Sequence, residues 1–218
     1  MVLPQTRVLS PSKWSLSMML QGIPSPLYVC YIIKNLIFQV RGINSTIFQS
    51  PARLHLTVTT LVLLDEKETE NAAGILQKCR NDILNILGGK KLVIKVKGVE
   101  YMNDDPAEVD VLYAKVQETD GDNCLQLIAN LLAEKFVAEG FAKQQHESVK
   151  LHVTLMNSLF GNKNDETGQS RHTFDARPIL EKCGDFDFGE MELNEIHISI
   201  RYTGGEQYYR PSSLIKLN

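Results

Sequence analysis

The chain has 218 residues, of which 43% are hydrophobic and 22% charged, and its formal net charge is −3. This length fits one domain or two small lobes that share a core, and these fractions are typical of globular proteins. The slightly acidic charge argues against a surface that coats nucleic acid through overall positive charge. A local basic groove is compatible with it, and the candidates are Lys90, Lys91, Lys95, Lys97, Arg171, His172 and Arg177. For the lysines we expect an ordinary solvated face.

The first 40 residues combine a polar stretch with an apolar one. Residues 1–26 are rich in Ser, Pro and Gln and lack the pattern of a signal peptide, so we expect a poorly structured leader. Residues 27–40 are apolar, but they contain a lysine, an asparagine and a glutamine and are shorter than the roughly 20 residues of a membrane span. We therefore expect a buried strand here, no membrane segment, and a folded domain over residues 27–218.

Strands and helices alternate after this stretch. The predicted elements are strands at 54–64, 92–97, 109–116, 150–158 and 190–202, and helices from Asp65 to Gly88, at 123–139 and at 176–182. Asp65 followed three residues later by Glu68 is typical of a helix N-terminus, and Gly88-Gly89 is typical of a helix end. The polar stretch 161–171 has no periodicity and predicts a loop beside the site. Several connections of hairpin length predict an α+β fold, with helices packed outside antiparallel sheets.

The cysteines carry no metal-binding or redox spacing. They are Cys30, Cys79, Cys124 and Cys183. They are widely scattered without a C-x-x-C pattern or nearby Cys/His ligands, so we expect reduced thiols in an intracellular protein and no metal site.

Two of the predicted strands share a six-residue pattern. Arg53–Val58 (RLHLTV) and Lys150–Leu155 (KLHVTL) each run basic, Leu, His, aliphatic, Thr, aliphatic. Because strand side chains alternate, the basic, His and Thr residues face one side and the three aliphatics face the other. Such a repeat is typical of duplicated lobes, here near 27–118 and 119–218, with the final strand returning to the first lobe. The alternative is two ordinary solvent-facing strands.

Two imidazoles and two hydroxyls that converge on one cleft suit phosphodiester chemistry. Histidine has a pKa near neutrality, so His55 and His152 can act as one general base and one general acid. Thr57 and Thr154 would donate hydrogen bonds to the non-bridging phosphoryl oxygens. The sequence leaves open which histidine is the acid, and this scheme needs no metal.

Four further residues are candidates for substrate binding. They are Arg53, Lys150, Tyr101 and Tyr113. The two basic residues could steer a phosphate, and the alternative is that they are solvated strand ends. The tyrosines could stack a base, and the alternative is that they belong to the core. We expect His197 to be structural, and Arg177 either reaches a phosphate or pairs with a local carboxylate.

These motifs resemble those of the two-histidine (2H) phosphoesterases, a superfamily defined by two His-x-Thr/Ser motifs in a bilobal, pseudo-symmetric fold. More narrowly, the chain resembles the subfamily of phosphoesterase domains that is found in subunit one of the activating signal cointegrator complex. The stretches that carry this resemblance are 45–49 (STIFQ), 98–106 (GVEYMNDDP), 109–116, 150–157 and 193–199. The resemblance covers about residues 42–201.

The resemblance implies a pseudo-two-fold fold whose antiparallel sheets face a central cleft. It implies a metal-independent phosphodiesterase without a cofactor, acting on RNA or DNA ends, cyclic phosphates or oligonucleotides, with ligation as the reverse reaction. The implied partners are single-stranded RNA or DNA, a helicase subunit and other members of the complex, in transcription coactivation and alkylation repair. The implied location is the nucleus, and the cytoplasm is a second, additional location.

Two alternatives to an enzyme stay open. One is a non-catalytic nucleic-acid or protein-binding module of the same complex, and the other is a mononucleotide-binding domain that anchors signalling partners. That subunit also carries a nucleic-acid-binding KH domain. The Gly-x-x-Gly clamp of a KH domain is absent from residues 1–41, so we expect none in this chain.

Overall fold

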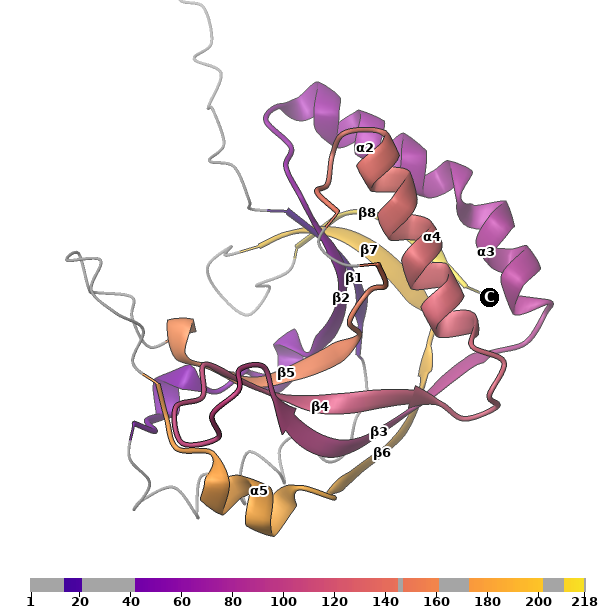
Figure 1. Ribbon diagram of the computed structural model, residues 1–218. Coiled ribbons are helices and arrows are strands. Elements are labelled where there is room, and N and C mark those ends of the chain that lie inside the picture. Colours follow the sequence, from indigo (N-terminus) through magenta and orange to yellow (C-terminus); the bar gives the residue numbers. More distant parts are fainter. Residues whose placement is uncertain (1–13, 21–41, 145–146, 161–172, 202–209, 218) are drawn as a thin grey trace, which may run out of the picture.

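One curled antiparallel sheet organises the computed structural model, which describes residues 14–20, 42–144, 147–160, 173–201 and 210–217 (Figure 1). Its strands are β1 (Trp14–Met19), β2 (His55–Leu61), β3 (Leu92–Tyr101), β4 (Val111–Glu118), β5 (His152–Asn157), β6 (Asp187–Leu193), β7 (Glu195–Ile200) and β8 (Arg210–Lys216). The spatial order is β6-β3-β4-β5-β2-β1-β7-β8, so the first motif strand, β2, and the second, β5, are neighbours at the centre.

The sheet has two four-stranded halves that meet at β2 and β5. These two strands pair at one position, Leu56 with Val153, whereas each half is joined by longer ladders. Strands β3 and β4 belong to the half of β5, so the predicted lobe boundary at residues 118 and 119 is wrong. Side-chain alternation is local and does not report which strands pair, so the sequence could not reveal that the β3–β4 hairpin joins the second motif.

The predicted final strand, 190–202, is two strands. Strand β6 pairs with β3 in one half, and β7 pairs with β1 in the other, so the chain passes from one half of the sheet to the other at Asn194. The expected return of the chain end to the half of the first motif is confirmed for β7. Strand β8 then pairs with β7 and was not predicted.

Strand β1 corrects the prediction of an unstructured leader. Trp14, Leu16 and Met18 are buried, and β1 pairs with β2 on one side and with β7 on the other. Their alternation with two serines is a strand pattern that the polar composition of residues 1–26 obscures. The rest of that leader, the predicted strand 27–40 and the predicted loop 161–171 lie outside the described residues.

Replacing Leu16 with alanine tests whether β1 is part of the core. Leu16 has an exposed fraction of 0%, so we expect the free energy of unfolding to fall by about 2–5 kcal/mol in chemical denaturation. Leu127→Ala, at a side chain that is 49% exposed, is the control and should change stability by about 0.5 kcal/mol or less. Equal small effects would show that β1 does not hold the sheet.

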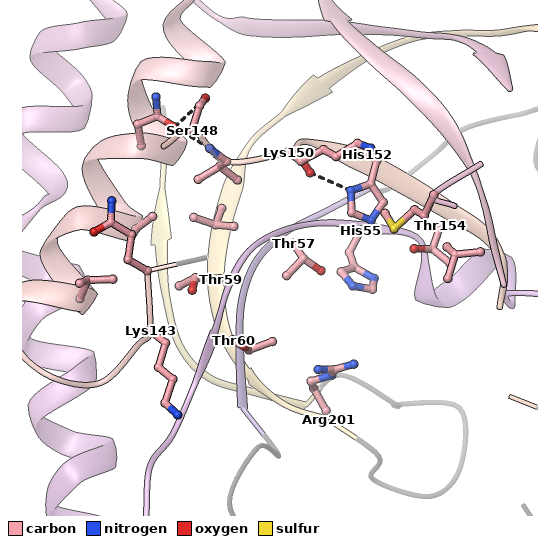
Figure 2. A pocket seen from close by; sticks show the side chains of 18 of the residues that line it. His55, Thr57, Thr59, Thr60, Lys143, Ser148, Lys150, His152, Thr154 and Arg201 are labelled. Atoms are coloured by element: carbon pink, nitrogen blue, oxygen red, sulfur yellow. Dashed lines mark hydrogen bonds between the residues drawn. The ribbon is translucent and has the colours of Figure 1, made fainter. Parts of the chain in front are cut away.

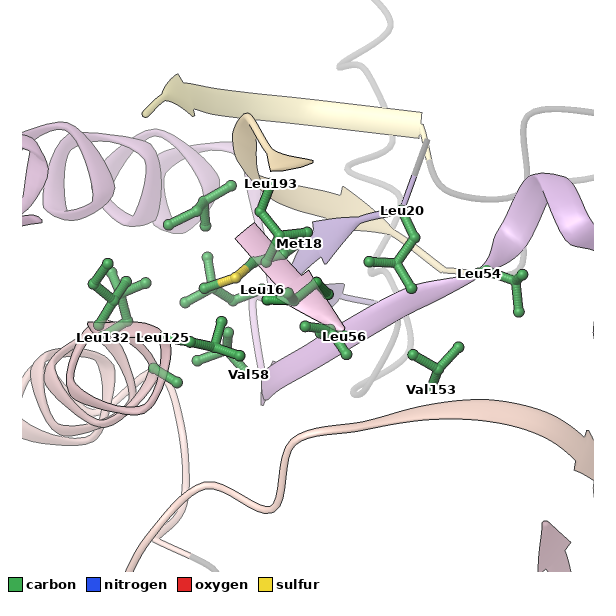
Figure 3. Packing of buried hydrophobic residues seen from close by; sticks show 14 of the residues in the cluster. Leu16, Met18, Leu20, Leu54, Leu56, Val58, Leu125, Leu132, Val153 and Leu193 are labelled. Carbon is green, nitrogen blue, oxygen red and sulfur yellow. The ribbon is translucent and has the colours of Figure 1, made fainter. Parts of the chain in front are cut away.

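Helices cover the apolar face of the sheet. They are α2 (Glu66–Lys78), α3 (Arg80–Leu87), α4 (Cys124–Ala138) and α5 (Arg177–Cys183), with 3-10 turns at Ser45–Ile47, Pro51–Arg53 and Ser158–Phe160. Helix α2 contacts β8, α4 contacts β2, and α5 packs on β3. In Figure 3, Leu16 and Met18 of β1 and Leu56 and Val58 of β2 form one cluster with leucines of α4. The aliphatic face of the first motif is therefore buried, as predicted.

The predicted helix from Asp65 to Gly88 is interrupted at Cys79 and forms α2 and α3. Its start is confirmed, because Asp65 Oδ1 accepts a hydrogen bond from the Glu68 N–H at 2.8 Å. Its end is confirmed by Gly88, whose φ of 56° is left-handed. In the described part of the chain, Cys79, Cys124 and Cys183 are buried free thiols. No described helix has the length and hydrophobicity to cross a membrane.

Candidate active site

The two motifs meet on the face of the sheet opposite the buried pair Leu56 and Val153. Continuing the antiparallel register from this pair sets His55 across from Thr154, and Thr57 across from His152. The four polar residues are thus related by a local two-fold axis. All four line one cavity of about 600 Å³ (Figure 2). The convergence predicted from the repeat is confirmed.

Each imidazole is held by the backbone carbonyl two residues before it. His55 Nδ1 lies 2.8 Å from the Arg53 carbonyl oxygen, and His152 Nδ1 lies 2.7 Å from that of Lys150. A carbonyl only accepts hydrogen bonds, so Nδ1 carries the proton in both rings and donates it. In the neutral rings Nε2 is therefore the unprotonated nitrogen, whose lone pair is able to accept a proton. The same tautomer is selected twice by the same local geometry.

Burial disfavours the charged form of both imidazoles. It lowers the pKa of His55 to about 4, opposed by the hydrogen bond to Arg53 and reinforced by the positive charges of Arg201 and His152. Burial also lowers the pKa of His152, and the ammonium of Lys150 adds to this shift. His55 is the more deeply buried of the two rings, with an exposed fraction of 8%. The two histidines are thus alike in tautomer and unlike in environment.

Tyr113 packs beside the second histidine instead of lining the cavity. Its ring centroid is 5.3 Å from that of His152 at 64°, and Lys150 Nζ lies 5.2 Å from the Tyr113 ring. The Tyr113 hydroxyl donates to Glu100 at 2.9 Å, and burial together with this carboxylate raises the pKa of Tyr113 to about 12. The ring is 4% exposed, so it supports His152 and Lys150 and offers no face to a base.

The other predicted binding residues differ in whether they line the cavity. Lys150 lines the cavity. Arg53 and Tyr101 are outside its lining: Arg53 contributes the carbonyl that holds His55, and Tyr101 is half-buried against the core. Side-chain alternation predicted that Arg53 shares the face of His55, but Arg53 belongs to the 3-10 turn at Pro51–Arg53, which ends before β2 begins.

Helix α4 anchors the segment that leads into the second motif. Asn130 Oδ1 accepts a hydrogen bond from the Val149 N–H at 3.0 Å, and Gln126 Nε2 donates to the Val149 carbonyl at 3.0 Å. Gln126 Nε2 also donates to Asn130 Oδ1 at 2.9 Å. Because Val149 precedes Lys150, this network fixes the backbone whose carbonyl orients His152.

Several cavity residues were not identified from the sequence. They are Gln49, Thr59, Thr60, Met102, Lys143, Asn157, Phe160 and Arg201. Arg201 had a detectable signal, because His197, Ser199 and Arg201 alternate with isoleucines along β7. Gln49 lies in the STIFQ stretch, where its N–H donates to the Leu155 carbonyl at 2.8 Å. Lys143 follows α4 and is not part of a strand, so no alternation pattern marks it as a cavity residue.

The remaining candidates lie away from the cavity. Lys91 pairs with Glu192, Lys95 pairs with Asp187, and Lys90 pairs with Asp122, so these lysines belong to solvated faces as expected. Arg177 pairs with Asp175 at 2.7 Å, so of its two predicted roles the structure shows the pairing with a local carboxylate. His197 is buried with Nε2 2.9 Å from Glu195 Oε2, in agreement with a structural role. Arg171 and His172 lie outside the described residues. Within the described ranges, no group of three or more metal-ligating side chains is present.

Two His-x-Thr strands related by a local two-fold axis at the centre of a curled antiparallel sheet define the class of 2H phosphoesterases. The profile of the AKAP7 2'5' RNA ligase-like domain matches residues 28–217. The chain therefore belongs to this family of 2H phosphoesterase domains.

Similar proteins agree with this assignment. The chain is 45% identical over 177 residues to mouse activating signal cointegrator 1 complex subunit 1, covering 75% of this chain and 50% of the mouse protein. It thus spans half the length of that relative. Among solved structures, TT0787 of Thermus thermophilus aligns with a TM-score of 0.53 at 15% identity, over 94% of this chain and 97% of that one. Escherichia coli LigT complexed with 3'-AMP aligns with a TM-score of 0.51 at 13% identity, over 95% and 99%. These structures share the fold, and the predicted fold class is confirmed.

Proposed function

We propose that the chain is a metal-independent phosphodiesterase that acts on nucleic acid, at RNA or DNA ends, cyclic phosphates or oligonucleotides. The observation that carries this proposal is a pair of histidines that line one cavity in the same tautomer, each with Nδ1 held by the backbone carbonyl two residues before it. By the register of the two strands, a threonine is across from each histidine. A scaffold needs neither feature, whereas acid–base catalysis at a phosphodiester needs both.

We infer the roles of the two rings in this mechanism from their different environments. His55 is the more deeply buried ring and has a pKa of about 4, so it stays neutral and serves as the general base. Its Nε2 takes the proton of the attacking water or ribose 2′-hydroxyl as the new P–O bond forms. His152, in its protonated form, gives a proton from Nε2 to the leaving oxygen as the old P–O bond breaks.

The threonines stabilise the negative charge that develops on the phosphoryl oxygens. Thr57 and Thr154 donate hydrogen bonds to the two non-bridging oxygens, one from each half of the sheet. Lys150 lines the same cavity and adds a positive charge beside His152. Support for a nucleotide substrate comes from LigT, a structure of the same fold that is complexed with 3'-AMP.

We further propose that the chain acts within an activating signal cointegrator complex, together with its helicase subunit, in transcription coactivation and alkylation repair in the nucleus. The mouse relative is named as a subunit of that complex and supports this proposal. Co-elution of the purified chain with the purified helicase subunit in size-exclusion chromatography tests it. Separate elution at micromolar concentrations would contradict it.

Turnover by the purified 218-residue chain tests the enzymatic proposal. Short single-stranded RNA and DNA, and RNA with a 2′,3′-cyclic phosphate end, are incubated with the protein in EDTA, and products are resolved by chromatography. We expect cleavage or ring opening that EDTA does not prevent. Oligonucleotides that bind in fluorescence anisotropy but are not converted would instead favour the non-catalytic binding module.

A further inference from the structure

We propose that the cavity contains a second anion subsite, formed by Thr60, Lys143 and Arg201, which takes the phosphate next to the scissile one. This inference rests on the proposed function and deepens it. It makes the substrate an oligonucleotide segment with at least two phosphates, in preference to a cyclic mononucleotide or a dinucleoside monophosphate.

A bulge in β2 brings Thr60 to the cavity. Ser17 pairs with Thr57 and Ser15 pairs with Thr60, so a two-residue step on β1 matches a three-residue step on β2. Ser15 and Ser17 share one face of β1, and their partners therefore share one face of β2. At a strand rise of about 3.3 Å per residue, Thr60 lies roughly 7–10 Å along the strand from Thr57. This separation suits neighbouring phosphates of an extended nucleic acid strand.

Two cations line the same part of the cavity. Lys143 follows α4, is exposed, and forms no ion pair with another described residue. Arg201 follows β7 and is near enough for its charge to lower the pKa of His55. In the view of Figure 2, Lys143 and Arg201 lie on the other side of Thr57 from Lys150. The Val62 N–H donates to the Phe141 carbonyl at 2.9 Å, and Ser15 pairs with both Thr60 and Ser199. The segments that carry Lys143 and Arg201 therefore run next to the Thr60 end of β2, whereas Lys150 precedes the second histidine.

The residue types at this second place match a phosphate better than a neutral group. A guanidinium offers several donors in a fixed plane, an ammonium adds charge, and a hydroxyl adds a short hydrogen bond. The carboxylates that line the cavity, Glu134 and Glu147, belong to α4 and to the segment before β5. Neither forms an ion pair with Lys143 in the described part of the chain, so the ammonium remains available to an anion.

Binding of dinucleotides that differ by one phosphate tests the subsite. The probes are the dinucleoside monophosphate ApA and its two end-phosphorylated forms, pApA and ApAp, titrated into the full chain by calorimetry at constant salt in EDTA. We expect one of the phosphorylated forms to bind at least about tenfold more tightly than ApA, as charge-assisted hydrogen bonds imply. Lys143→Gln and Thr60→Val should each reduce this ratio severalfold and leave ApA affinity within about twofold.

The control is Lys67→Gln, which removes an exposed lysine of α2 outside the cavity and should leave the ratio unchanged. Equal affinities for all three probes, an unchanged ratio in Lys143→Gln, or no binding of any probe at millimolar concentration would each overturn the proposal. The calorimetric ratio does not depend on turnover, which is measured in the separate assay of the proposed function. A failure of the phosphodiesterase proposal would therefore appear as binding with the predicted ratio and no conversion.

Discussion

Replacing His152 with asparagine is expected to reduce turnover by about 10²–10⁴-fold, the usual contribution of a general acid or base. The amide nitrogen of asparagine can occupy the place of Nδ1 and keep the hydrogen bond to the Lys150 carbonyl. The substitution therefore removes Nε2 and its proton with little change to the backbone. His55→Asn should cause a loss of the same order, because it removes the base while preserving the contact with Arg53. Rates are measured in EDTA on the substrate that the wild-type chain converts fastest.

His197→Gln is the matched control for these variants. His197 lies on β7 outside the cavity lining, and glutamine places an amide nitrogen where Nε2 meets Glu195. We expect its activity to stay within severalfold of wild type. Each variant is also unfolded with denaturant, so that lost activity is separated from lost structure. A His152→Asn variant that keeps more than a tenth of wild-type activity would exclude this residue as the general acid.

The second large effect concerns pH, where kcat/KM is expected to peak between about pH 4 and a limit below 6.5 and to fall about tenfold per unit above that limit. The profile of kcat/KM reports the free protein. His152 must be protonated to act as acid, and burial and Lys150 lower its pKa from 6.5, so its active form is lost as the pH rises. His55 must be neutral, and its pKa of about 4 means that activity is lost only as the pH falls through about 4.

Lys150→Gln provides an internal check on this profile. Removing the ammonium removes one cause of the lowered pKa of His152, so the basic limb should move to higher pH while the acidic limb stays in place. The position of the limb is informative even if substrate affinity also falls. A basic limb above pH 8 in the wild-type chain, or a shift of the limb to lower pH in Lys150→Gln, would contradict the assignment of His152 as acid.

Local patterns were sufficient to predict the site because they depend on backbone geometry. In a strand, residues two apart share a face, so the order His, aliphatic, Thr places the imidazole and the hydroxyl together whatever the strand packs against. Leu56 and Val153 are buried beneath the site as this alternation requires. The helix boundaries at Asp65 and Gly88 are local in the same sense, since they are defined by caps within a few residues.

Elements defined by their partners were missed. Strand β1 is six residues long, and β8 (RPSSLIK) contains a proline and two serines. The alternation in β1 is too short to stand out from the polar stretch around it, and β8 has no clear alternation. Each is a strand because a neighbour supplies the hydrogen bonds. The break at Asn194 was missed for a related reason: β6 and β7 are both strand-like, and only their pairing with β3 and β1 separates them.

The sequence by itself determined the four residues of the candidate site, the face of each motif strand on which they lie, and the family. Only the tertiary structure decided that the motifs are neighbours, that Tyr113 supports His152, and that Lys143 and Arg201 join the cavity. It also decided the unequal environments of the two histidines. Alternation follows from the covalent backbone, whereas desolvation and long-range charge depend on residues that approach only when distant strands pair.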